Sequence, residues 1–143
     1  PDVVKTVTHE VVTAEELGGA TTHSTLSGVC DCAYENDVDT LMMVRRFINY
    51  LPSNNREKAP YRPTPDTADR MEMSLDTLVP DNPNKPYDMK EAVHKIVDDN
   101  EFWELQPDHA KNIIIGFARM DGHPVGIVAN QPLVQAGCLD IKS

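Results

Sequence analysis

The sequence predicts a mixed α/β protein, and three features of its pattern support this. Apolar residues recur at helical spacing from Leu41 to Leu51 and again from Met89 to Val97. Two apolar runs flank Asp121-Gly122, which is typical of two strands joined by a tight turn. A proline-rich stretch separates the two helical regions. With 143 residues, 40% hydrophobic and 25% charged, the chain can bury a core and is neither disordered nor fibrous.

The first expected helix begins at a capping box. The Thr13 hydroxyl can accept a hydrogen bond from the amide three residues on, and Glu16 can reach back to the Thr13 amide. Gly18-Gly19 should end this helix after about one turn. Gly18-Gly19-Ala20 could instead present free backbone amides to an anion, but local physics favours the helix-ending role.

A second helix should begin near Asn36 or Asp37 and end at Pro52, which cannot continue it. Its apolar positions are Leu41, Val44, Phe47, Ile48 and Leu51. Seven of the 11 prolines follow, and each fixes φ, removes an amide donor and disfavours helix in its predecessor. We therefore expect a mostly extended, irregular bridge that contains Pro52, Pro60, Pro63, Pro65, Pro80, Pro83 and Pro86.

After the bridge, Asp88 can cap a helix over residues 89–98, with an apolar stripe of Met89, Val93, Ile96 and Val97. Residues 112–120 and 125–129 then predict a strand-turn-strand unit around Asp121-Gly122. Asp98-Asp99 stands at the helix end, where negative charge opposes the helix dipole. A solvated face is favoured there over a general acid-base pair.

Composition and motifs exclude several functions. The net charge of −10 argues against a nucleic-acid binder, and no apolar run approaches the roughly 18 residues of a membrane span. The three cysteines have neither zinc nor disulfide spacing, so we expect reduced thiols and no metal site. The five histidines are scattered, and the sequence has no phosphate-binding loop, nucleophile elbow or zinc-protease motif.

The end of the second predicted strand is a candidate ligand site. Asn130-Gln131-Pro132 follows the strand directly, and Gly137-Cys138 follows a short loop. Loops at strand ends are where α/β folds bind ligands. Local reasoning goes no further than a possible pocket at this edge.

A set of sequence blocks carries a family resemblance over essentially all 143 residues. The blocks, in chain order, are Pro1-Asp2-Val3-Val4-Lys5, Glu16-Leu17-Gly18-Gly19-Ala20, His23, Ser27-Gly28-Val29, Glu35-Asn36-Asp37, Leu51-Pro52-Ser53-Asn54-Asn55, Leu75-Asp76-Thr77, Val79-Pro80, Pro86-Tyr87-Asp88-Met89, Ala118-Arg119, Gly126-Ile127-Val128-Ala129-Asn130-Gln131-Pro132 and Gly137-Cys138-Leu139-Asp140-Ile141. In these blocks and their order the chain resembles the carboxyltransferase (β) subunits of biotin-dependent acyl-CoA carboxylases, most of all those that act on propionyl-CoA.

The resemblance implies a crotonase-like α/β fold of two lobes built from ββα units. Residues 1–86 would be the end of the N-terminal lobe with the proline-rich bridge, and residues 87–143 the start of the C-terminal lobe. The chain would then be an internal segment of a longer subunit, as its opening on Pro1 also suggests. We therefore expect the stripes of Leu41, Phe47 and Ile48 and of Val93, Ile96 and Val97 to lack packing partners.

The resemblance also implies an activity: transfer of the carboxyl group from carboxybiotin to the α-carbon of a short acyl-CoA, giving methylmalonyl-CoA from propionyl-CoA. A partner α subunit would carry the biotin and use ATP. The β subunits would form a hexameric ring of dimers, in a mitochondrial matrix or a bacterial cytoplasm. The alternatives are a non-catalytic relative, a crotonase-type hydratase or isomerase, and a structural interaction module.

The same resemblance places the site residues. The family's two oxyanion holes are Gly-Gly-Ala turns, and Gly18-Gly19-Ala20 matches neither by its flanks, so no catalytic residue is expected in this segment. The region from Asp98 to Gln131 would belong to the acyl-CoA site. Asn130 and Gln131 would lie nearest the acyl-CoA or biotin, followed by Pro132, Gly137 and Asp140. Alternatively, Asn130 and Gln131 only cap the strand and satisfy loop amides.

Overall fold

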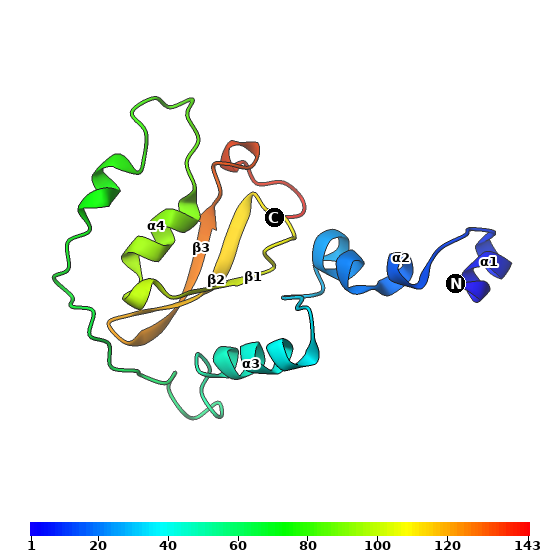
Figure 1. Ribbon diagram of the computed structural model, residues 1–143, viewed down its shortest axis with the longest axis horizontal. Coiled ribbons are helices and arrows are strands. Elements are labelled where there is room, and N and C mark those ends of the chain that lie inside the picture. Colours follow the sequence, from blue (N-terminus) through cyan, green and yellow to red (C-terminus); the bar gives the residue numbers. More distant parts are fainter.

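A computed structural model describes residues 1–143 and shows the mixed α/β architecture that the sequence predicts. Figure 1 shows a three-stranded sheet with helices on both sides and a slender N-terminal arm that extends away from it. The α-helices are α1 (Asp2–Thr8), α2 (Ala14–Gly18), α3 (Asp37–Ile48) and α4 (Met89–Ile96), and the strands are β1 (Phe102–Leu105), β2 (Ile113–Met120) and β3 (His123–Asn130). Short turns of other helical types are η1 (Thr22–Ser27), η2 (Met73–Thr77), η3 (Asp98–Asn100) and η4 (Gln135–Gly137).

The predicted hairpin is confirmed, and its turn has the geometry that its two residues favour. Asp121 and Gly122 both have positive φ, 50° and 73°, as a two-residue type I′ turn requires. Met120 pairs with His123 next to the turn, and Ile113 pairs with Asn130 at the other end. β1 adds an antiparallel third strand to β2, with Phe102 opposite Ala118. The sequence analysis did not predict β1.

Helix α4 covers one face of the sheet. Val93 and Val97 are buried against Ala118 in the small apolar core, which half-buried residues surround (Met89, Phe102, Val125 and Ile127). The expectation that the stripe of α4 lacks partners is therefore wrong for these two valines. The helix also ends at Ile96 rather than at residue 98, because Val97 is extended and Asp99 is left-handed, with φ 53°.

On the opposite face of the sheet, the closest aromatic contacts come from the end of α3 and the residues that follow it. The Phe47 ring lies 5.2 Å from that of Trp103, and the Tyr50 ring stacks at 5.9 Å on that of Phe117. The helix ends at Ile48, three residues before the predicted Leu51. No residue within α3 is buried, and Ile48 is 57% exposed, so the expectation of an unpartnered stripe is confirmed here except at Phe47.

The N-terminal arm confirms the capping box of α2. The Glu16 amide donates to the Thr13 hydroxyl at 3.1 Å, and Glu16 Oε2 accepts from the Thr13 amide at 2.8 Å. Gly19 ends the helix and donates its amide to the Glu15 carbonyl, and the Thr21 amide donates to the Glu15 carboxylate. The helix-ending role of Gly18-Gly19 is thus confirmed.

The bridge between α3 and α4 is irregular, as its prolines predict, apart from the short turn η2. It runs around the outside of the sheet from the end of α3 to the start of α4 (Figure 1). Arg70 attaches it to the end of α4 by donating hydrogen bonds to the carbonyls of Lys95 and Val97. No helix is both long and apolar enough to cross a membrane.

Candidate functional site

The loop after β3 is held by a hydrogen bond from the strand end. Asn130 is exposed, and its Nδ2 donates to the carbonyl of Gly137 at 2.6 Å. Gly137 is buried with φ 74°, a conformation that only glycine adopts without strain. The loop therefore folds back on Asn130, while Asn130 Oδ1 makes no hydrogen bond within residues 1–143.

The side-chain amide of Gln131 is hydrogen-bonded to the start of helix α4. Its side chain is only 4% exposed. Its Oε1 accepts a hydrogen bond from the Met89 amide at 3.1 Å, and its Nε2 donates to Asp88 Oδ1 at 2.7 Å. The same Asp88 oxygen caps the helix by accepting from the Lys90 amide. Gln131 and Asp88 together thus accept the first backbone amides of α4, those of Met89 and Lys90. These contacts are of the kind expected if Gln131 has a structural role rather than a ligand-binding one.

Asn112 anchors the loop from the start of β2, a role that sequence reasoning missed. It is buried, and its Nδ2 donates to the Cys138 carbonyl at 2.8 Å and to Ser143 Oγ at 3.0 Å. Its backbone carbonyl accepts from the Gln131 amide. Asp140 is part of the same anchored turn, because its carboxylate accepts from the Lys142 amide and from the Ser143 hydroxyl, whose oxygen accepts from Asn112. The Lys142 amide and then the Ser143 hydroxyl hold the pKa of Asp140 below its usual value.

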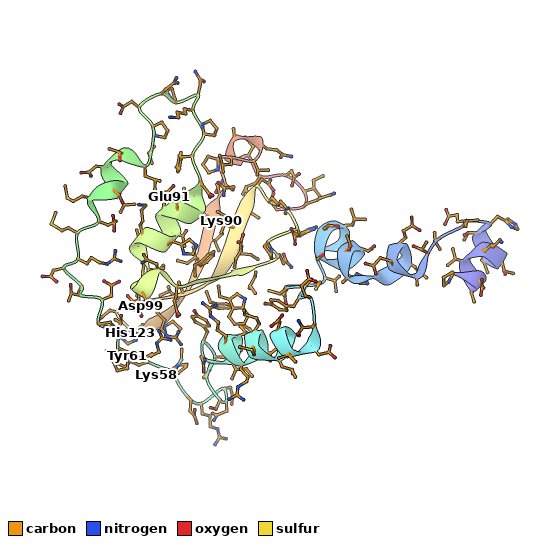
Figure 2. All side chains as sticks on the ribbon, in the orientation of Figure 1. Lys58, Tyr61, Lys90, Glu91, Asp99 and His123 are labelled. Carbon is orange, nitrogen blue, oxygen red and sulfur yellow. The ribbon has the colours of Figure 1, made fainter.

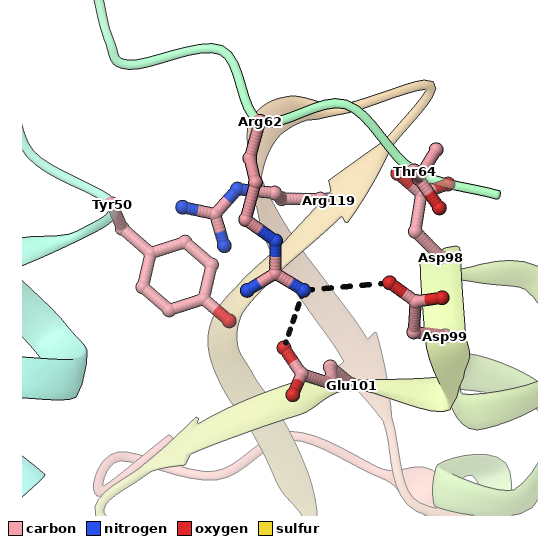
Figure 3. Close-up of a pocket in the computed structure, with 7 residues that line it drawn as sticks. All are labelled: Tyr50, Arg62, Thr64, Asp98, Asp99, Glu101 and Arg119. Carbon is pink, nitrogen blue, oxygen red and sulfur yellow. Dashed lines mark hydrogen bonds and ion pairs between the residues drawn. The ribbon is translucent and has the colours of Figure 1, made fainter. Parts of the chain in front are cut away.

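A second part of the predicted site region forms a charged pocket at the other end of the hairpin. Figure 3 shows its lining residues, which come from the end of α3, the bridge, η3 and β2: Tyr50, Arg62, Thr64, Asp98, Asp99, Glu101 and Arg119. The hairpin strands are eight residues long, so this pocket lies roughly 23 Å from the Asn130 loop. The region from Asp98 to Gln131 therefore includes both the charged pocket and the strand end at the Asn130 loop.

Asp98 corrects the sequence interpretation of the Asp98-Asp99 pair. Asp98 is only 9% exposed. Its two carboxylate oxygens accept the backbone amides of Asp121 at 3.0 Å and Gly122 at 2.7 Å. The expected solvated face is thus wrong for Asp98, which holds the hairpin turn. Asp99 does face solvent and pairs with Arg62 at 3.4 Å.

An apolar groove lies between α3 and the β1 edge of the sheet. It measures about 330 Å³ and is lined by Asp31, Cys32, Tyr34, Thr40, Val44, Phe47, Trp103 and Leu105. Burial, followed by the hydrogen bond and charge of Cys32, raises the pKa of Tyr34 to about 12. The three cysteines are free thiols, and no group of three or more His, Cys, Asp or Glu residues could hold a metal ion.

Known proteins resemble this chain over its whole length. The profile of the carboxyl transferase domain matches residues 1–143. A propionyl-CoA carboxylase beta chain of Roseobacter denitrificans is 66% identical over all 143 residues, which are 28% of that protein. A methylmalonyl-CoA decarboxylase subunit alpha of Veillonella parvula is 52% identical over the same residues, also 28% of its length.

Solved structures agree with the sequence relatives. The transcarboxylase 12S hexamer, solved with methylmalonyl-coenzyme A and methylmalonic acid bound, matches 99% of this chain with a TM-score of 0.94 and 40% identity. The match covers 27% of the 12S chain, so residues 1–143 span only about a quarter of the proteins that they resemble. The fold is that of crotonase-like carboxyltransferases, as the sequence resemblance implied. The chain belongs to the carboxyl transferase domain family.

Proposed function

We propose that the protein containing residues 1–143 is the carboxyltransferase subunit of a biotin-dependent carboxylase that converts propionyl-CoA to methylmalonyl-CoA. The observation that carries this is the 66% identity, over every residue of the chain, to a propionyl-CoA carboxylase beta chain. The fold supports it, because the matching transcarboxylase 12S structure contains methylmalonyl-coenzyme A.

In this function the segment supplies binding surface and support. Carboxybiotin on a partner subunit would supply CO2 when its nitrogen–carboxyl bond breaks. The freed ureido nitrogen would take the α-proton of the acyl-CoA, and the α-carbon would then form its new bond to CO2. As the proton leaves, negative charge develops on the thioester oxygen, where one backbone amide contributes on the order of 3 kcal/mol. We assign that stabilisation to turns elsewhere in the subunit, because the Gly19 amide is already bonded to Glu15.

We place the ligand contact of this segment at the Asn130 loop. Asn130 is exposed, and its unused Oδ1 can accept a hydrogen bond from an amide N–H of coenzyme A or from a ureido N–H of biotin. Pro132 and Gly137 shape the loop on which it stands, and Asp140 lies in the same segment. Gln131 fixes the start of the loop to helix α4 through its hydrogen bonds to Asp88 and Met89.

Paired variants of the full-length subunit test this assignment. Asn130→Ala should raise the KM for acyl-CoA or carboxybiotin and lower the melting temperature less than Gln131→Ala does, because it removes one hydrogen bond, to the Gly137 carbonyl, rather than two. Gln131→Ala should lower the melting temperature, because it removes the buried side-chain hydrogen bonds to the Met89 amide and to Asp88. It should leave the KM normal in the folded fraction. An unchanged KM in Asn130→Ala would refute the ligand contact.

The reaction and its acyl chain are tested with the holoenzyme. We expect the full-length protein and its biotin-carrying partner subunit to carboxylate propionyl-CoA with a higher kcat/KM than acetyl-CoA or methylcrotonyl-CoA. Product mass spectrometry identifies the carboxylated thioester. A preference for another acyl group would refute the proposed substrate, and hydration of an enoyl-CoA without carboxylation would favour the hydratase alternative.

We also propose that the subunit works as a hexameric ring of dimers with a biotin carboxylase α subunit. The hexamer assembly of transcarboxylase 12S supports this, as do the many exposed apolar side chains here, among them Leu41 and Ile48. An active monomer in a sedimentation experiment would contradict it. The compartment, a mitochondrial matrix or a bacterial cytoplasm, remains a prediction.

The Veillonella relative points to a second candidate, the reverse transfer in a methylmalonyl-CoA decarboxylase. Both reactions move a carboxyl group between the same acyl-CoA and biotin, so the segment needs no different residues for either. The direction is decided by the partner. Product formation that depends on ATP and bicarbonate indicates a carboxylase, whereas methylmalonyl-CoA consumption without ATP indicates a decarboxylase.

A further inference from the structure

Arg119 is a buried cation with no carboxylate partner. Its side chain projects from β2 into the charged pocket, and the residue is only 6% exposed (Figure 3). None of the ion pairs in residues 1–143 includes it, and its Nε has no hydrogen-bond partner. Asp98, Asp99 and Glu101 line the same pocket, but none of them forms an ion pair with Arg119. A buried guanidinium without a direct ion pair is costly, so its remaining contacts carry unusual weight.

Those remaining contacts both reach the segment that follows α3. Arg119 Nη2 donates to the carbonyl of Asn49 at 2.6 Å, and the guanidinium carbon lies 4.4 Å from the centre of the Tyr50 ring. Tyr50 is itself buried and stacks on Phe117, two residues before Arg119 in β2. One side chain of the hairpin thus holds two successive residues that are 70 and 69 positions earlier in the chain.

The start of the bridge contacts the same hairpin beyond Arg119. The Arg62 amide donates to the Gly122 carbonyl at 3.0 Å, and the rings of Tyr61 and His123, both labelled in Figure 2, lie 5.0 Å apart. The bridge can approach this closely because residue 122 is a glycine: a Cβ there would collide with the Tyr61 ring and the Arg62 carbonyl. The chain after α3 therefore meets the hairpin at two places, Asn49-Tyr50 and Tyr61-Arg62, and the residues between them, 51–59, are exposed.

The ion pairs at this junction contribute less than the contacts of Arg119, because they are exposed to solvent. The Arg62 side chain is half exposed, and its Nη2 lies 3.4 Å from Asp99 and 3.5 Å from Glu101. The Arg46 pair with Glu101 is longer, 3.9 Å, and also open to solvent. Exposed ion pairs contribute little to stability because water and salt screen them. Two charged side chains of this pocket are buried: Asp98, which holds the hairpin turn, and Arg119, which alone of the two reaches the segment after α3.

We propose that Arg119 is the pin that fixes the end of α3 and the start of the proline-rich bridge onto the β2–β3 hairpin, and that this role requires a guanidinium. A planar guanidinium can lie on the Tyr50 ring while an edge N–H reaches the Asn49 carbonyl, whereas the compact ammonium of lysine cannot do both. This inference is independent of the proposed catalytic function.

Hydrogen exchange with mass spectrometry on the full-length protein tests the pin. In Arg119→Met and in Arg119→Lys, we expect amides in residues 49–64 and 119–123 to exchange about tenfold faster or more, together, because a hydrogen bond to a charged group is lost. Arg45→Met is the matched control, because Arg45 lies exposed on α3 outside all ion pairs, and it should change neither peptide.

The partner side of the contact gives a second, independent test. Tyr50→Leu should speed amide exchange in the same two peptides, whereas Tyr50→Phe keeps the ring and should leave their exchange at the wild-type rate. Exchange in the Arg119→Met, Tyr50→Leu double variant should be little faster than in either single variant, because both changes break the same contact. If Arg119→Met does not fold, the Tyr50 pair alone decides. Faster exchange confined to the hairpin, wild-type exchange in Arg119→Lys, or multiplying effects in the double variant would overturn the proposal.

Discussion

Replacing Asp98 by asparagine should loosen the hairpin turn far more than the same change at its neighbour Asp99. Asp98 uses one oxygen for the amide of Asp121 and the other for that of Gly122, and it is almost fully buried. Asparagine keeps one oxygen but turns an NH2 group toward the second amide, which then has no acceptor. A hydrogen bond to a charged group contributes about 1.5–3 kcal/mol, so Asp98→Asn should cost about 2 kcal/mol.

That cost corresponds to roughly 30-fold faster exchange of the turn amides, measured by hydrogen exchange on the full-length protein. Asp98→Ala removes both acceptors and should cost about 3–5 kcal/mol. Asp99→Asn is the matched control, since it breaks only a half-exposed ion pair to Arg62 and should cost about 0–1 kcal/mol. Equal effects of Asp98→Asn and Asp99→Asn would refute the assigned role of Asp98.

Other consequences of the structure can be measured directly. Gly116→Ala should lower the free energy of unfolding by about 1–3 kcal/mol in denaturant experiments, because a Cβ there collides with the Trp103 carbonyl. Gly126→Ala is the control and should be nearly neutral, because its Cβ meets open space; equal losses would contradict the packing. Ultraviolet titration should show that Tyr34→Phe removes a tyrosine that ionises near pH 12. Because the folded pKa is raised above 10, its stabilisation holds below pH 10 and is lost as the pH rises toward 12; a normal tyrosine titration would refute this. The isolated segment 1–143 should aggregate or remain partly unfolded, and a sharp cooperative melt of its monomer would contradict this.

Elements with local signals could be predicted from the sequence. The capping box of α2 lies within four residues, and the I′ turn needs only Asp121-Gly122 between two apolar runs. The irregular bridge follows from proline chemistry alone. Strand β1 could not be found in this way, because its four residues become a strand only by pairing with β2.

Long-range contacts explain what the sequence could not show about the candidate site. Asp98 bonds to amides 23 and 24 residues away, and Gln131 bonds to Asp88, 43 residues earlier. No local pattern distinguishes these buried polar side chains from exposed ones. The expectation that the apolar stripes of an internal segment lack packing partners holds for α3 except at Phe47 and fails for α4, because the hairpin that covers Val93 and Val97 lies within the same segment.

The most direct measurement of the central claim is incorporation of isotope from labelled bicarbonate into an acyl-CoA by the full-length protein. With its biotin-carrying partner subunit, ATP and propionyl-CoA, the assay should yield labelled methylmalonyl-CoA. The yield should fall to background when either subunit or ATP is left out. Absence of labelled product from a folded, assembled complex whose partner subunit still carboxylates its own biotin would contradict the assignment of this protein as the carboxyltransferase.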